Sequence, residues 1–265
     1  MQQLRNGQIC SWTILRGAPE QLDPLLAESV TMHQGRIPSL FLPNGSIDLI
    51  VSAGSPLPTP WGAAGMLIQV KRARALHVPP ASADAFRIPL EMGAYRLLID
   101  ADEPLEDGMY AAPERLKHRM ETSRTGAYQF DPVSCLSALA EAMPEPRAPK
   151  ARRFRETREV LQVARLGNPH TVESWSRQAG VSVRRIERMV NSSDGIRPKL
   201  FLRLLRLSRA IAAMTFDLSF CEIGDEYSFS DQSHLTRECR ALTGWSPSML
   251  REKIRARQIF SLESA

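Results

Sequence analysis

The stretch that most constrains the fold is "TVESWSRQAGVSVRRIERMV", which begins at Thr171. Thr171 has the side chain of a helix N-cap, Gly180 has the backbone freedom that ends a helix, and Ser182 is placed to cap the next helix. Apolar residues recur at helical spacing on both sides of this turn, and we expect these to face inward: Val172, Trp175, Ala179, Val181, Ile186, Met189 and Val190. The stretch therefore predicts two short helices joined by a tight turn, a helix-turn-helix unit.

A second stretch, "CEIGDEYSFSDQSHLTRECRALTG", repeats this design. Either Ser230 or Asp231 caps its second helix, and Ser182 and Ser230 lie 48 residues apart. Between the units, residues 198–214 form one predicted long helix of about 25 Å at 1.5 Å per residue. That length suits two reading helices in successive major grooves, about 34 Å apart. The apolar positions expected to face inward in this unit are Ile223, Tyr227, Phe229, Leu235 and Cys239.

The outward faces of the two second helices carry polar side chains suited to reading DNA. Arginine makes bidentate contacts with guanine and with phosphate, and glutamine matches adenine. We expect the outward face of the first unit to hold Arg184, Arg185, Glu187 and Arg188, and that of the second to hold Gln232, Ser233, Thr236 and Arg237.

The charge of the chain is unevenly distributed. Residues 1–150 hold 14 Lys+Arg and 16 Asp+Glu (−2), whereas residues 151–265 hold 20 and 13 (+7). A basic half favours a polyanionic partner, for which nucleic acid is the default. No apolar run approaches the roughly 20 residues of a membrane span, and the amino terminus lacks the pattern of a signal peptide. We therefore expect a cytoplasmic protein with no membrane contact.

The four cysteines and five histidines are scattered along the chain. None of the cysteines forms a C-x-x-C pair, so we expect neither a metal site nor a disulfide framework, and we expect no cofactor.

A proline-rich segment divides the chain into two domains of an α+β protein. Three prolines in "MPEPRAPK" predict an extended linker over 143–151. Before it, residues 1–142 mix strand and helix patterns: "SLFLPNGSIDLIVSAG" predicts two strands around a turn, and residues 112–123 and 132–143 look helical. We expect a β-rich domain there, a barrel or sandwich closed by helices, and an all-α domain with the two units over 152–265.

Residues 152–255 resemble the AraC-type transcriptional regulators. The resemblance rests on "GVSVRRIERMV", on "RLLRLSRAI" and above all on "FSDQSHLTRECRALTGWSPSMLR". It implies base reading by Arg184, Glu187, Arg188, Gln232, Ser233, Thr236 and Arg237. It also implies phosphate contacts near the helix starts, where we place Thr171, Ser182, Arg185, Ser230 and Asp231. The chain departs from the family pattern at Ser228, where glycine is usual, and at Ser176 and Val190, where alanine and phenylalanine are common.

The resemblance also implies partners for the whole chain. We expect double-stranded promoter DNA, a homodimer formed through residues 1–142 as the regulatory domain, a contact with RNA polymerase, and a small-molecule effector of unknown identity. The motif "LPNGSIDLIV" resembles a strand-turn motif of one subgroup with a β-rich partner domain. Four aromatic or imidazole side chains are candidates for an effector pocket, with an ordinary core role as the alternative: Trp61, His77, Phe86 and Tyr95.

An enzyme is the competing interpretation, because Asp231, Ser233 and His234 lie close together in the sequence. On one helix, successive residues point about 100° apart, so these three side chains cannot converge on one substrate atom. The chain also lacks G-x-S-x-G, a phosphate-binding glycine loop and H-E-x-x-H. We therefore expect no enzyme, and keep a partner-binding adaptor without DNA affinity as a third interpretation.

Several residue roles stay open at this stage. Arg188 and Arg237 either read bases or pair with the neighbouring Glu187 and Glu238, and Arg237 could instead contact phosphate. Glu187 is a reader or a solvated charge. Arg185 faces the groove or the side of the helix, and His234 contacts DNA or packs within the unit.

Overall fold

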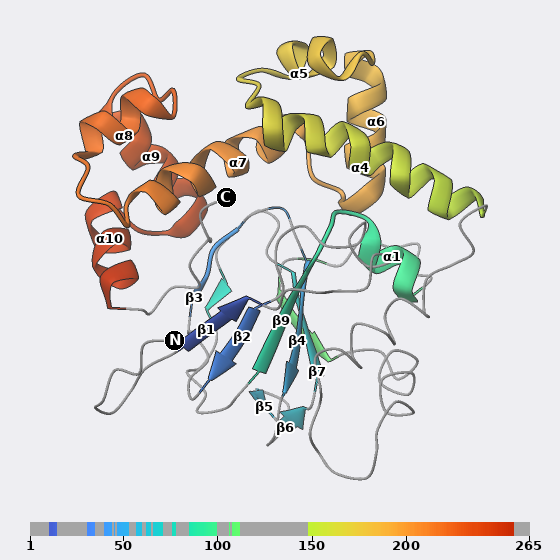
Figure 1. Cartoon of the computed structure of the whole chain (residues 1–265), viewed down its shortest axis with the longest axis horizontal. Helices are drawn as coiled ribbons and strands as arrows, with labels where there is room; N and C mark the ends of the chain where they lie inside the picture. The colour runs from blue at the N-terminus through green and yellow to red at the C-terminus, as the bar shows by residue number, and fades with distance from the viewer. Residues whose placement is uncertain are drawn as a thin grey trace.

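The computed structural model describes residues 11–14, 31–34, 40–43, 45, 47–52, 57–59, 62–64, 66–70, 76–77, 85–99, 106, 108–111 and 148–256. Figure 1 shows an antiparallel sheet in the first half of the chain, with the helices of the second half lying across one end of it. Within these described residues, no helix is both long enough and apolar enough to cross a membrane.

The first half is built on a six-stranded sheet. Its strands, in spatial order, are β1 (Ser11–Ile14), β2 (Thr31–Gln34), β9 (Ala85–Leu90), β4 (Ile47–Ser52), β7 (Met66–Val70) and β10 (Gly108–Ala111). Two short pairs lie beside it: β3 (Leu40–Phe41) with β8 (Leu76–His77), and β5 (Leu57–Thr59) with β6 (Gly62–Ala64). Most of the described residues of the first half therefore lie in strands, whereas closure into a barrel or sandwich stays a prediction.

The two central strands are buried along their whole length. All six residues of β4 and all six of β9 are buried, so both faces of the sheet are covered at this point. Asp48 therefore lies inside rather than on a solvent face, and the Nε of Arg87 approaches its Oδ2 at 2.8 Å. Within the predicted turn before β4, Gly45 is described and has φ +76°. The helices expected over 112–123 and 132–143 lie outside the described residues.

A short helix, α1 (Ala94–Ile99), follows β9. The second half is helical, as predicted, and consists of α4 (Pro149–Gly167), α5 (Val172–Ala179), α6 (Val183–Asp194), α7 (Pro198–Ala213), α8 (Phe220–Glu226), α9 (Gln232–Thr243) and α10 (Pro247–Arg255). Pro149 occupies the start of α4, where a missing N–H costs no hydrogen bond. Residues 149–151 of the expected linker are therefore helical.

The two helix-turn-helix units, α5–α6 and α8–α9, repeat each other at a spacing of 48 residues. Thr171 and Ser219 each start the first helix with a capping box. The turns place Gly180 at φ +64° and Ser228 at φ +59°, both left-handed. From this left-handed residue to the next cap, the turn of the second unit is one residue longer than that of the first, since Asp231 rather than Ser230 caps its reading helix α9.

Helix α7 belongs to both units. Its Phe201 and Leu205 are buried with Trp175 of α5 in one apolar cluster. Its Leu207 and Ile211 are buried with residues of α8, α9 and α10 in a second cluster. The same helix thus forms part of both cores, and Figure 1 shows it running between the two groups of helices.

An arginine–glutamate pair ties α9 to α7. The Nε and Nη2 of Arg203 donate to the two carboxylate oxygens of Glu238, both at 2.9 Å. Arg206, one turn along α7, lies 4.8 Å from the centre of the Phe229 ring and donates to the carbonyl of Ser228. Burial lowers the pKa of Arg206, while the nearby Glu238 carboxylate opposes that change. These contacts fix the second reading helix and its turn against α7.

The two left-handed turn residues give a matched pair of substitutions. Ser228→Gly should raise the free energy of unfolding by up to about 1 kcal/mol, because a non-glycine residue at positive φ costs roughly 1–2 kcal/mol. Gly180→Ala should lower it by about 1 kcal/mol for the same reason, since open space surrounds the added Cβ. Urea denaturation measures both, with Ser228→Ala as the near-neutral control. A Ser228→Gly variant less stable than the wild type would contradict this assignment.

Removing the Glu238 carboxylate should weaken the attachment of α9. Glu238→Ala is expected to lower the free energy of unfolding by about 1–2 kcal/mol, because two charge-assisted hydrogen bonds from Arg203 are lost at a largely buried site. Thermal denaturation followed by circular dichroism measures the change. Glu187→Ala is the control, because Glu187 is exposed and should alter stability by less than about 0.5 kcal/mol. Equal stabilities of the two variants would show that the pair does not hold α9.

Candidate nucleic-acid interface

The first reading helix, α6, presents the polar face that the sequence predicts. Its inner face is anchored by the buried Ile186, Met189 and Val190. The hydroxyl of Ser182 accepts the N–H of Arg185 at 3.2 Å and so caps the helix. The outward side chains that stand exposed to solvent are Arg184, Arg185, Glu187 and Arg188.

The arginines of α6 differ in their partners. Arg185 reaches sideways to Glu156 of α4 at 3.4 Å, which supports the alternative that it faces the side of the helix. Arg184 and Arg188 form no salt bridge with any residue in the described ranges. Two guanidinium groups on this face are therefore accessible, and a ligand would not have to displace an existing ion pair.

The second reading helix, α9, shows the same division between an inner and an outer face. Leu235 and Cys239 are fully buried, and burial raises the pKa of the Cys239 thiol to about 12. Gln232, Ser233 and Arg237 are exposed.

The remaining two outward side chains of α9, Thr236 and Arg237, differ in their contacts. Thr236 is half-buried, and its hydroxyl donates to the carbonyl of Gln232 at 2.9 Å. Arg237 has no salt bridge within the described part of the chain, because Glu238, the acid expected to compete for it, is held by Arg203.

The Asp231–Ser233–His234 block has a structural explanation. Asp231 Oδ1 accepts the backbone N–H of His234 at 2.6 Å, which caps α9. The His234 Nδ1 accepts the N–H of Ser230 at 3.2 Å, and its ring meets the ring of Phe229 edge-on at 5.4 Å. The hydrogen bond from the backbone of His234, reinforced by Arg237, lowers the pKa of Asp231. Asp231 and His234 therefore organise the start of α9.

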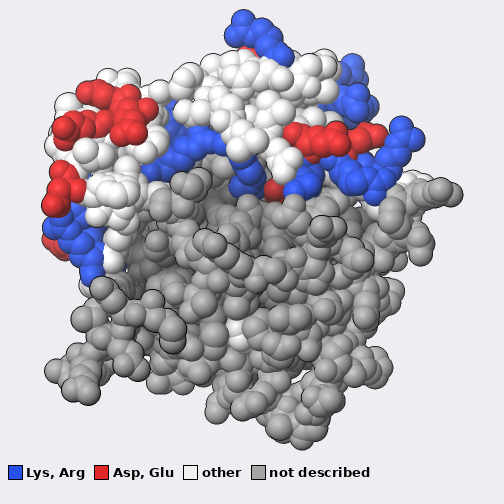
Figure 2. Space-filling model, in the orientation of Figure 1, with Lys and Arg blue, Asp and Glu red and all other residues white. Residues whose placement is uncertain are grey.

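Charged side chains divide the surface of the helical half. Figure 2 shows Lys and Arg between the two units and beside α4, where a band of Asp and Glu also lies, and further Asp and Glu over α8. The exposed acids of α8 are Glu222, Asp225 and Glu226. Part of the basic charge is structural, because Arg209 donates to Asn168 and to the carbonyl of Arg165, as Arg203 does to Glu238. These internal roles were not predicted from the sequence, although Arg203, Arg206 and Arg209 recur every third residue on one face of α7.

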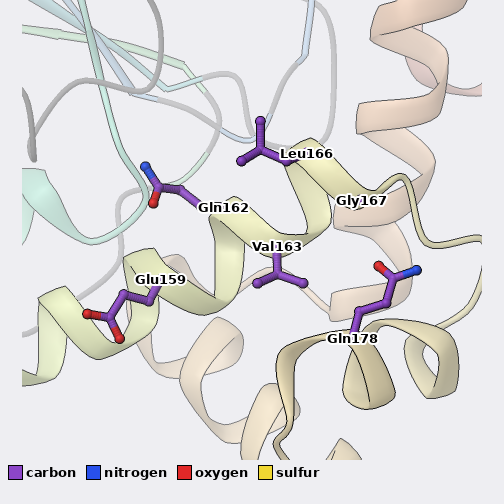
Figure 3. A pocket seen from close by; sticks show the side chains of 6 residues that line it. All are labelled: Glu159, Gln162, Val163, Leu166, Gly167 and Gln178. Atoms are coloured by element: carbon purple, nitrogen blue, oxygen red, sulfur yellow. The ribbon is translucent and has the colours of Figure 1, made fainter.

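A shallow groove lies on α4 and α5, away from the reading faces. Its volume is about 440 Å³, and Leu166 at its rim is 86% exposed. No predicted base reader lines it. Figure 3 shows the residues that do: Glu159, Gln162, Val163, Leu166, Gly167 and Gln178.

The four candidates for an effector pocket are not assembled into one cavity among the described residues. Phe86 on β9 is 3% exposed and Tyr95 on α1 is 4% exposed, and burial raises the pKa of Tyr95 to about 12. Both side chains are buried, which agrees with a core role and also with a place in the wall of an enclosed pocket. His77 lies on the short strand β8, and Trp61 lies outside the described residues.

Comparison with known proteins places this geometry in a family. Residues 175–253 match the model of a family described as a helix-turn-helix domain. No protein with a curated description matches the chain.

Among solved structures, the chain is similar to the DNA-binding domain of AdpA, a global transcriptional factor, in complex with a target DNA (27% identity, 39% of this chain and 96% of that chain, TM-score 0.35). It is also similar to the C-terminal domain of AraT, a response regulator from Geobacillus stearothermophilus (19% identity, 46% of this chain and 95% of that chain, TM-score 0.33). A third similar structure is ToxT from Vibrio cholerae (10% identity, 85% of this chain and 98% of that chain, TM-score 0.46).

The family match covers both turns, both reading helices and the helix that joins them. Residues 175–253 therefore form a helix-turn-helix domain of the AraC type, and the chain that carries it is a DNA-binding transcription regulator.

Proposed function

We propose that each chain reads a specific promoter sequence by inserting α6 and α9 into successive major grooves of double-stranded DNA. The side chains that read bases in this proposal are Arg184, Glu187, Arg188, Gln232, Ser233, Thr236 and Arg237. Contacts with phosphate come from the helix starts at Thr171, Ser182 and Ser230 and from Arg185. The Asp231 carboxylate already fills the acceptor position at the start of α9, so Asp231 acts as a cap rather than as a phosphate contact.

The observation that carries this proposal is the pair of capped helices with exposed polar faces on one rigid helix. Helix α7 has 16 residues, which corresponds to about 24 Å at 1.5 Å per residue. Because α7 forms part of both cores, the two faces are held at a defined separation. A separation of this order suits grooves that repeat about every 34 Å along DNA, once the width of the units is added.

The β-rich half has the regulatory role in this proposal. Residues 1–142 form a barrel or sandwich that joins two copies of the chain and responds to a small-molecule effector, with Trp61, His77, Phe86 and Tyr95 as candidate contacts. Bound at a promoter in the cytoplasm, the dimer acts on RNA polymerase. The connector to the helical domain ends where α4 begins, at Pro149.

Replacing one arginine on each reading face tests the recognition. Arg188→Ala and Arg237→Ala should each weaken binding to a selected genomic fragment by about 1–3 kcal/mol if they read bases. Gel shifts measure the affinities, and all of them should fall steeply with added salt as phosphate contacts release counterions.

Arg152→Ala is the matched control, because Arg152 is exposed, lies on α4 and pairs with Glu156. It should leave the affinity within about twofold of the wild type. A folded wild-type chain that retards no genomic fragment at low salt would overturn the proposed function. Equal losses on specific and nonspecific DNA would assign the two arginines to phosphate.

The dimer is tested without DNA. Light scattering of the whole chain should report twice the mass of one chain at micromolar concentration, because the proposal joins two copies through the β-rich half. A single-chain mass at every concentration up to the solubility limit would remove the dimer from the proposal.

A further inference from the structure

A turn of the β-rich half contacts the helical domain beside the first helix-turn-helix unit. The turn joins β9, which lies inside the sheet between β2 and β4, to α1. Three residues of this turn and one of α1 contact the helical domain, and we call these four the seat: Glu91, Met92, Gly93 and Arg96. Figure 1 shows the turn after β9 reaching the underside of α4 and the lower end of α6.

The centre of the seat is an ion pair across the two halves of the chain. Glu91 Oε1 lies 2.9 Å from Arg165 Nη2 of α4, and their side chains are only 3% and 18% exposed. Glu91 Oε1 also accepts the N–H of Met92 at 2.9 Å, which fixes the carboxylate within its own turn. The Arg165 guanidinium lies 5.5 Å from the centre of the Phe201 ring at the start of α7. A charge held this way is costly to separate, because either partner left alone would be buried without its counterion.

The other seat residues fix α6 and the unit's core. Met92 is fully buried in the apolar cluster that contains Trp175 and Ile186. The Nη1 of Arg96 donates to the carbonyl of Ser192 in the last turn of α6 at 3.1 Å. Gly93, at φ +84°, lies so close to α6 that an added Cβ would stand 3.4 Å from the Cβ of Ser193.

A second turn of the β-rich half reinforces the contact. A Cβ on Gly45 would lie 3.2 Å from the ring of Phe201 and 3.7 Å from Ile196. The β-rich half therefore meets the first unit at the end of α4, the end of α6 and the start of α7. Three helices contacted in this way cannot rotate about one another or about the sheet without breaking buried contacts.

The seat leaves the reading face open. Its contacts on α6 are at Ser192 and Ser193, in the last turn, whereas Arg184 and Arg188 lie in the first two turns and are exposed. An arrangement that blocked DNA would cover the first turns instead. The docked arrangement is therefore compatible with DNA binding.

We propose that Glu91 is a positioning residue for DNA recognition: through Arg165 it fixes the first reading helix relative to the β-rich half, and so sets the spacing between the half-sites that a dimer accepts. This rests on the proposed function, in which the β-rich half joins two copies. If that half is a rigid support, the reading helices of one copy stand at a fixed distance and rotation from those of the other. A freed helical domain would swing on the connector before Pro149 and accept several spacings.

The first experiment needs no DNA. Hydrogen exchange of the whole chain compares Glu91→Gln with Glu156→Gln, which removes the exposed Arg152 and Arg185 pairs of α4 instead. In Glu91→Gln we expect faster exchange in the seat, at the end of α4 and in the last turn of α6, with α9 unchanged, and no such change in Glu156→Gln. Arg96→Gln, which leaves no buried charge unpaired, should give the same pattern more weakly. If both Glu91→Gln and Arg96→Gln exchange at the wild-type rate at the ends of α4 and α6, the proposal is overturned.

The second experiment measures spacing on a selected two-half-site fragment. Inserting about 5 base pairs, half a helical turn, should weaken wild-type binding about tenfold or more, because the second half-site turns to the opposite face. The same insertion should weaken the binding of the Glu91→Gln protein by less than about threefold, because its helical domain swings to follow the second half-site. An equal loss in both proteins would overturn the positioning role. If the wild type binds no fragment at all, the proposed function fails, and the exchange experiment still decides whether the seat holds the first unit.

Discussion

The burial of α7 on two sides is the interaction on which the DNA-binding half depends. Phe201 and Leu205 complete the core of the first unit, and Leu207 and Ile211 complete that of the second. Neither unit can keep its apolar core if it rotates away from this helix, because exposing a buried leucine or phenylalanine costs roughly 1.5–3 kcal/mol. Two short helix pairs, each too small to be stable alone, thereby become one rigid reader.

Positive charge in this half has two uses that the net charge of residues 151–265 does not distinguish. The arginines of α7 and Arg165 act within the molecule, on Glu238, Phe229, Glu91 and backbone carbonyls. The arginines of the reading faces, by contrast, stand in solvent. A salt-dependent affinity would therefore report the second group, whereas the first group sets the geometry in which the second is presented.

Local patterns predicted the helical half well. The caps at Thr171 and Ser182, the apolar faces and the long central helix are determined by neighbours within a few residues, so sequence alone indicates them. The choice of Asp231 over Ser230 as cap needed backbone geometry. The seat was not predictable, because Glu91 and Arg165 are 74 residues apart and either could be a solvated surface charge by pattern. The strand order of the sheet depends on similarly distant pairings, such as β2 with β9.

The central claim is that one chain reads two successive major grooves with α6 and α9. Methylation interference on a selected fragment tests it most directly, because methyl groups on guanine N7 stand in the major groove where arginine binds. The account predicts two patches of interference within each half-site, about 10–10.5 base pairs apart on one face of the DNA, with the Arg188→Ala and Arg237→Ala proteins each losing a different patch. A single patch per chain, or both patches lost together on either substitution, would contradict it.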